Sequence, residues 1–85
     1  MIQQTVELNS SGGLYGRSVT ELIQTASRYS SDIFLTYNGR KVNLKSILGV
    51  LSLGIQNKAE IKLEASGRDE EEALQQVIKT LTSLD

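Results

Sequence analysis

The chain has 85 residues, a formal net charge of −1, and neither cysteine nor histidine. Without these two residue types, disulfide bonds, thiol chemistry and the usual zinc sites are excluded. The small net charge gives the whole molecule no reason to bind nucleic acid or an anionic membrane. No apolar run approaches the ~20 residues that span a bilayer, and the first residues do not resemble a signal peptide. We therefore expect one soluble, cytoplasmic domain over residues 1–85, without a metal or other cofactor.

The first third of the chain is expected to form a strand and a helix. Residues 2–8 alternate loosely between apolar and polar types, which is typical of a half-buried strand. A polar, glycine-containing loop is expected at residues 9–13. Ser18 and Glu21 fit a capping box, in which side chains pair with first-turn amides. The buried face of the following helix is predicted from residues at helical spacing: Val19, Leu22, Ile23 and Ala26.

The middle of the chain is expected to form a hairpin and a short helix. Residues 32–37 are rich in β-branched and aromatic types, and residues 40–44 are expected to return as the second strand. Between them, Asn38 and Gly39 suit a type I′ turn, because both residues tolerate positive φ. A short helix is predicted at residues 46–53, weakened from within by Gly49.

The last third completes an α+β pattern. Residues 59–65 alternate between apolar and charged types, which favours a strand. Residues 69–72 are all acidic and are expected at the start of a final helix, where the helix dipole favours negative charge. The buried stripe of that helix is predicted to be Leu74, Val77, Ile78 and Leu81. The order β-α-β-β-α-β-α predicts a four-stranded antiparallel sheet with three helices on one face.

Residues 13–20, Gly-Leu-Tyr-Gly-Arg-Ser-Val-Thr, resemble the active-site stretch of the HPr family, which reads roughly G-[IL]-H-A-R-P-A-[TS]. Further similarity to the Gram-positive type of HPr covers residues 24–29, 37–54 and 65–70. Because these blocks occur in order over nearly the full length, the chain is identified as a member of this family. The resemblance implies the HPr-like open-faced β-sandwich, which is the predicted arrangement.

Tyr15 stands where the family has the histidine that carries the phosphoryl group. A phenol has a pKa of about 10 and is mostly protonated at neutral pH, whereas transfer needs a neutral imidazole nitrogen. We therefore expect that the protein is not a competent phosphohistidine carrier, and the resemblance implies that it is not an enzyme. Three roles for Tyr15 stay open: an aromatic contact for a partner, a drifted surface residue, and a phosphotyrosine relay. Arg17, which the family also has, is either a solvated charge or a contact for an acidic or phosphorylated group.

Ser46 precedes an apolar run and, by itself, suits the N-cap of a helix. The surrounding residues resemble the regulatory site of Gram-positive HPr, where a dedicated ATP-dependent kinase/phosphorylase modifies the matching serine. The resemblance thus implies regulatory phosphorylation at Ser46. A phosphate there would add nearly two negative charges at a helix start, a place that the helix dipole favours.

The predicted short helix contains too many apolar residues for one buried stripe. Val50 and Leu53 can face the sheet, which would leave Ile47, Leu48 and Leu51 on another side. Exposed apolar patches of this kind usually mark docking surfaces. The alternative is a tightly packed helix in which only Leu48 is exposed.

The resemblance implies a regulatory protein of carbon catabolite control, similar to the histidine-less, Crh-like members of the family. Its expected partners are the HPr kinase/phosphorylase and a catabolite-control transcription regulator or metabolic enzyme, with phosphotransferase enzymes as further candidates and without direct nucleic-acid or membrane binding. The alternatives are a phosphocarrier for sugar transport with a degenerate active site, and a drifted paralogue. Residues 2–8 do not decide whether two copies exchange the first strand. The predicted partner-binding residues are Tyr15, Arg17, Thr20, Ile47, Leu48 and Leu51.

Overall fold

The computed structural model describes residues 1–8, 17–56 and 58–83. Along this part of the chain the elements are β1 (Ile2–Glu7), α1 (Arg17–Ser27), β2 (Asp32–Tyr37), β3 (Arg40–Asn43), α2 (Ile47–Leu51), β4 (Glu60–Ser66) and α3 (Glu70–Thr82). The predicted order of strands and helices is therefore confirmed. The predicted strand boundaries agree with the structure to within one residue.

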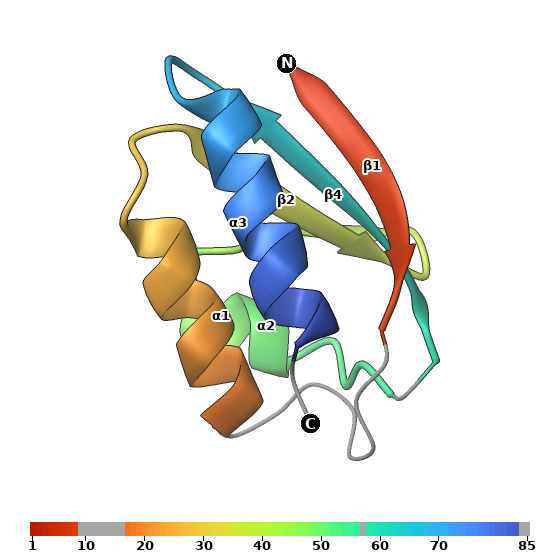
Figure 1. The fold of residues 1–85 in the computed structure, drawn as a ribbon. Coiled ribbons are helices and arrows are strands. Elements are labelled where there is room, and N and C mark those ends of the chain that lie inside the picture. The colour runs from red at the N-terminus through yellow and green to blue at the C-terminus, as the bar shows by residue number, and fades with distance from the viewer. Residues whose placement is uncertain (9–16, 57, 84–85) are drawn as a thin grey trace.

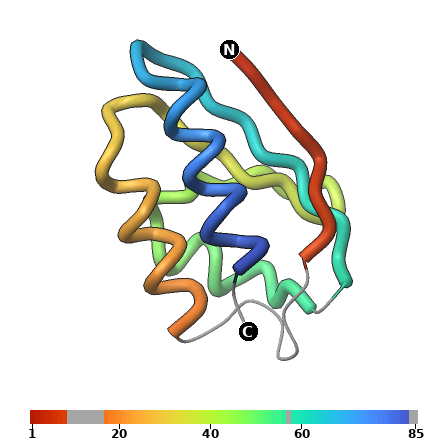
Figure 2. The backbone as a smooth tube through the Cα atoms, in the orientation of Figure 1, coloured from red at the N-terminus to blue at the C-terminus, as the bar shows by residue number. Residues whose placement is uncertain are grey.

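The strands form one antiparallel sheet in the order β1-β4-β2-β3. The last strand of the chain is thus central, between the first strand and the hairpin, as the tube in Figure 2 shows. In the register of β2 and β4, Ile33 pairs with Ala65 and Leu35 pairs with Leu63. Figure 1 shows α1 and α3 side by side over one face of this sheet, and α1 also packs against α2. The predicted α+β architecture is confirmed.

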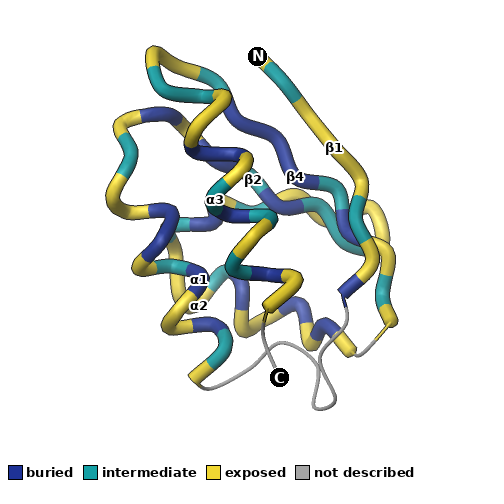
Figure 3. Tube along the Cα trace, viewed as in Figure 1, coloured by how far each residue is buried: buried dark blue, intermediate teal, exposed yellow. Residues whose placement is uncertain are grey.

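The core lies between the sheet and the helices (Figure 3). The sheet contributes alternate residues of β2 and β4, and the helices contribute the faces that their periodicity predicts. Ile23 and Ile78 lie at the margin of this core, partly buried. The fully buried side chains of the elements include Val19, Leu22, Ala26, Ile33, Leu35, Val50, Ile61, Leu63, Ala65, Ala73, Val77 and Leu81.

Two local predictions are wrong. Arg17 is already helical, so Ser18 is the second residue of α1 and cannot be its N-cap, which requires a non-helical backbone. The capping box is therefore not formed, and Glu21 instead lies 3.6 Å from the Nε of Arg17. The second helix ends at Leu51 rather than Leu53.

The tight turn between β2 and β3 is confirmed. Asn38 and Gly39 have φ values of 51° and 78°, as a type I′ turn requires. Within the described ranges, no helix is both long and apolar enough to cross a bilayer.

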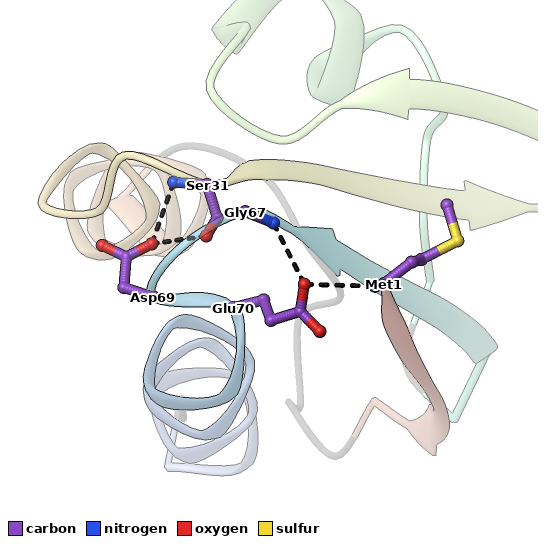
Figure 4. A network of polar contacts seen from close by, with 5 residues as sticks. All are labelled: Met1, Ser31, Gly67, Asp69 and Glu70. Atoms are coloured by element: carbon purple, nitrogen blue, oxygen red, sulfur yellow. Dashed lines mark hydrogen bonds and ion pairs between the residues drawn. The ribbon is translucent and has the colours of Figure 1, made fainter.

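A polar cluster joins the start of α3 to the connection between α1 and β2 (Figure 4). The carboxylate of Asp69 accepts hydrogen bonds from the backbone N–H groups of Ser30 and Ser31, each at 3.0 Å, and from the hydroxyl of Ser31. Glu70 accepts from the N–H of Gly67 and lies 3.1 Å from the α-amino group of Met1. The acidic start of α3 thus holds neighbouring segments in place, in addition to its predicted interaction with the helix dipole.

These contacts alter the titration of both carboxyl groups. The hydroxyl of Ser31, followed by the N–H of Ser30, lowers the pKa of Asp69. The N–H of Gly67, followed by the α-amino group of Met1, lowers the pKa of Glu70. In each case a hydrogen bond to the charged form favours that form.

Candidate modification and docking site

Ser46 is the N-cap of α2. Its backbone is extended, with φ −103° and ψ 109°, and its Oγ accepts a hydrogen bond from the N–H of Gly49 at 3.2 Å. Its carbonyl accepts the first helical bond, from the N–H of Val50 at 3.1 Å. This is the geometry for which serine is preferred at the start of a helix. Because the residue is exposed, the hydroxyl is accessible at the surface.

Gly49 borders the Ser46 hydroxyl. A Cβ at position 49 would lie 3.2 Å from Ser46 Oγ and 3.5 Å from the Cβ of Val42. The lack of a side chain therefore leaves one side of the hydroxyl uncovered. The sequence alone indicates only that Gly49 weakens the helix. Its position beside the Ser46 hydroxyl is visible only in the structure.

The turn that leads from β3 into α2 is closed by Asn43. The Oδ1 of Asn43 accepts from the N–H of Lys45 at 2.8 Å, and its carbonyl accepts from the N–H of Ser46 at 3.0 Å. Leu44, which lies between Asn43 and Lys45 in the sequence, is fully buried, and its N–H donates to the carbonyl of Ile33. The position of Ser46 is thus set by the edge of the sheet on one side and by α2 on the other.

Three apolar side chains of α2 face solvent. Ile47, Leu48 and Leu51 are 45%, 77% and 41% exposed, whereas Val50 is fully buried and Leu53 nearly so. We call these three exposed residues the α2 patch. The predicted division of the helix into two sides is confirmed, and the alternative in which only Leu48 is exposed is wrong. The α2 patch begins directly after Ser46.

Arg17 and Thr20 lie on α1, which packs against α2. Both residues are exposed, and the side chain of Arg17 is 94% accessible despite its ion pair with Glu21. Tyr15 lies outside the described residues. The structure therefore brings together Ser46 and the α2 patch, and it places Arg17 and Thr20 on the neighbouring helix.

Within the described part of the chain, no group of three or more acidic side chains is placed to hold a metal ion. The chemically distinctive features are an accessible hydroxyl and an apolar surface beside it. Such an arrangement can accept a modification and change how a partner docks.

Comparisons with known proteins agree with this architecture. The model of the family described as the PTS HPr component phosphorylation site matches residues 2–83. The structure of HPr-C-His from Thermoanaerobacter tengcongensis is 40% identical, with a TM-score of 0.94 over 98% of this chain and 93% of that chain. Phosphocarrier protein HPr from Bacillus anthracis is 35% identical, with a TM-score of 0.91 over 94% of this chain and 95% of that chain.

Crh from Bacillus subtilis is also similar, at 42% identity over 95% of this chain and 93% of that chain. Its TM-score is lower, at 0.76, and that crystal structure is described as a dimer with a swapped domain. In the present structure, β1 pairs with β4 of the same chain. These likenesses place the protein among the small phosphocarrier-like α+β proteins. More narrowly, the chain belongs to the HPr family of the bacterial phosphotransferase system.

Proposed function

We propose that this protein is a regulatory, Crh-like member of the HPr family, controlled by phosphorylation of Ser46. The observation that carries the proposal is the accessible Ser46 hydroxyl immediately before the α2 patch. A serine that served only as an N-cap would need no such surface beside it. On this proposal the protein acts in the cytoplasm as a binding module rather than as an enzyme.

The family's phosphohistidine chemistry is not available to this chain. It contains no histidine, and Tyr15 occupies the position of the phosphorylated residue in the family's motif. A protonated phenol is a poor nucleophile at neutral pH, and its phosphate ester would transfer the group less readily than phosphohistidine. Arg17 is present but cannot replace the missing acceptor.

A phosphate on Ser46 would change the chemistry of the docking surface. It would add nearly two negative charges and three acceptor oxygens next to Ile47 and Leu48. A partner that offers an apolar cleft bordered by arginine or lysine would then bind the modified form more tightly, because charge-assisted hydrogen bonds add to apolar burial. We propose a catabolite-control transcription regulator as that partner and the HPr kinase/phosphorylase as the modifying enzyme.

The direct test is incubation with the HPr kinase/phosphorylase and ATP, followed by peptide mass spectrometry. We expect one phosphate on Ser46, none in Ser46→Ala, and normal modification in Ser52→Ala. Ser52 is a matched control, because it is an exposed serine at the other end of the same helix. An unmodified Ser46 in the wild-type protein would overturn the proposal.

A second candidate function is phosphocarriage in sugar transport with a degenerate active site. It is favoured by the family match over residues 2–83 and by the identity to HPr structures. Incubation with phosphoenolpyruvate and the first phosphotransferase enzyme tests it. We expect no acid-labile label on the wild-type protein, whereas label on Tyr15→His would show that this docking surface is retained. Label on the wild type would favour the second function.

A drifted paralogue would behave differently from both candidates. It would accept no phosphate in either assay, yet would still retain a partner in a pulldown. The two phosphorylation assays therefore separate the three hypotheses.

A further inference from the structure

Lys45 precedes Ser46, and its side chain turns inward rather than into solvent. Its Nζ donates a hydrogen bond to the backbone carbonyl of Tyr29 at 2.7 Å, and the residue is half-buried. Lysine is usually exposed, and fixing its long side chain costs conformational entropy. A hydrogen bond this short between residues 16 positions apart in the sequence therefore indicates a specific structural connection.

The acceptor lies at the end of α1. The N–H of Tyr29 donates to the carbonyl of Ala26, so Tyr29 continues the last turn of that helix. Carbonyl groups at the end of a helix have no intrahelical partner and carry partial negative charge, which suits an ammonium donor. Tyr29 also packs against the core, so the anchor of Lys45 is itself fixed.

The element on the other side of Lys45 depends on such anchors. The helix α2 has five residues, far fewer than a helix needs to be stable alone. Its C-terminal end is held by Val50 within the helix and by Leu53 just after it, both of which are buried in the core. At its N-terminal end, Leu44 is buried in the core, and Lys45 adds a side-chain hydrogen bond to another element, whereas the bonds of Asn43 close only the local turn.

We propose that Lys45 is a positioning residue for Ser46: its bond to the Tyr29 carbonyl fixes the turn that presents the hydroxyl to the modifying enzyme. The role in phosphorylation rests on the proposed function, whereas the tether itself does not. Lys45 thereby joins the modification site to the end of α1, the helix that also carries Arg17.

The first experiment measures amide hydrogen exchange in the whole protein by NMR, in the wild type, Lys45→Met, Lys45→Arg and Lys79→Met. The informative amides are those of Gly49 and Val50, whose bonds to Ser46 open when the turn opens. In Lys45→Met we expect these two amides to exchange about tenfold faster, because a hydrogen bond with a charged donor is lost. The amide of Leu63 in the central strand reports any global loss of stability and corrects for it.

Two variants serve as controls. Lys79 is an exposed lysine in the last turn of α3, so Lys79→Met removes a comparable charge without touching the Ser46 turn. Arginine can donate to the same carbonyl, so Lys45→Arg should restore most of the protection. Exchange at Gly49 that is unchanged in Lys45→Met, or equally fast in the arginine variant, overturns the tether.

The second experiment measures steady-state phosphorylation of Ser46 in the same four proteins. If Lys45 only positions the hydroxyl, Lys45→Met should raise KM severalfold at unchanged kcat, and Lys45→Arg should recover the wild-type KM. A fall in kcat at unchanged KM, or no change, overturns the positioning role. A wild-type protein that the kinase does not modify would overturn the proposed function instead, and the exchange rates would then decide the tether alone.

Discussion

Gly49 combines a cost in stability with a benefit for the Ser46 site. Glycine inside a helix is less favourable than alanine, yet a methyl group here would lie 3.2 Å from Ser46 Oγ. We expect Gly49→Ala to change the free energy of unfolding by less than about 0.5 kcal/mol, because the gain in helix propensity is offset by the shift of Ser46 Oγ, which the cap hydrogen bond holds in place. We also expect slower phosphorylation of Ser46, because the hydroxyl becomes covered. Urea denaturation and initial kinase rates measure the two effects, and an undiminished rate would contradict the second.

Gly67 is required for a different reason. It has a φ of 150°, and a Cβ there would lie 2.8 Å from the Cα of Ser31, which is backbone and cannot move easily. We expect Gly67→Ala to lower the free energy of unfolding by about 3 kcal/mol, through strain and overpacking combined.

Gly54→Ala is the matched control for Gly67→Ala. Gly54 also has positive φ, at 60°, but has open space where a Cβ would lie. This control should cost only about 1 kcal/mol, which is the price of left-handed backbone alone. Equal losses in urea denaturation of the two variants would show that the approach to Ser31 is unimportant.

At the scale of elements, α2 has one side that stabilises the fold and another, the α2 patch, that we propose binds a partner. We expect Leu48→Ser to change the free energy of unfolding by less than about 0.5 kcal/mol, because the side chain is 77% exposed. The same variant should lose affinity for the regulator after phosphorylation, in calorimetry or surface plasmon resonance. By contrast, Val50→Ala should cost about 2 kcal/mol and leave the affinity of the folded fraction intact. Retained binding in Leu48→Ser would contradict a docking role for the α2 patch.

Periodicity alone predicts most elements correctly, because each buries one face against the same core. It fails where burial depends on the tertiary fold. Leu53 is buried, yet it follows the end of α2 in an irregular segment, so its apolar character led to a predicted helix that is two residues too long. Glu64 should be exposed by alternation but is 7% accessible. Its carboxylate pairs with Lys62, two residues earlier on the same strand, and with Lys41 of β3, which only the sheet brings near.

The candidate site divides in the same way. The sequence identifies Ser46 and the three residues of the α2 patch, because a cap and an excess of apolar side chains are local features. It does not reveal the contact of Lys45 with Tyr29, or the clearance at Gly49, because both depend on segments that meet only after folding. Ser18 shows the converse error: its local motif fits a capping box, but α1 already includes Arg17, so Ser18 lies inside the helix.

At the scale of the whole molecule, the contacts of Asp69 and Glu70 join α3 to the first strand and to the connection after α1 (Figure 4). Both carboxyl groups have a lowered pKa in the folded protein. In the unfolded chain their pKa values return to about 4, so the unfolded state binds protons at a higher pH than the folded state. Their stabilising contribution is therefore complete above about pH 5 and is lost as the pH falls through the folded-state values.

We accordingly expect the free energy of unfolding, from urea titrations between pH 7 and pH 3, to decline steeply at the acidic end. Asp69→Asn should lower stability at pH 7 and flatten this decline, because the amide lacks the charge that the Ser30 and Ser31 donors stabilise. Asp32→Asn removes an exposed carboxylate from the start of β2 and should leave the decline as steep as in the wild type. If both variants keep the wild-type slope, other carboxyl groups govern acid stability, and the cluster at the start of α3 does not hold the molecule together.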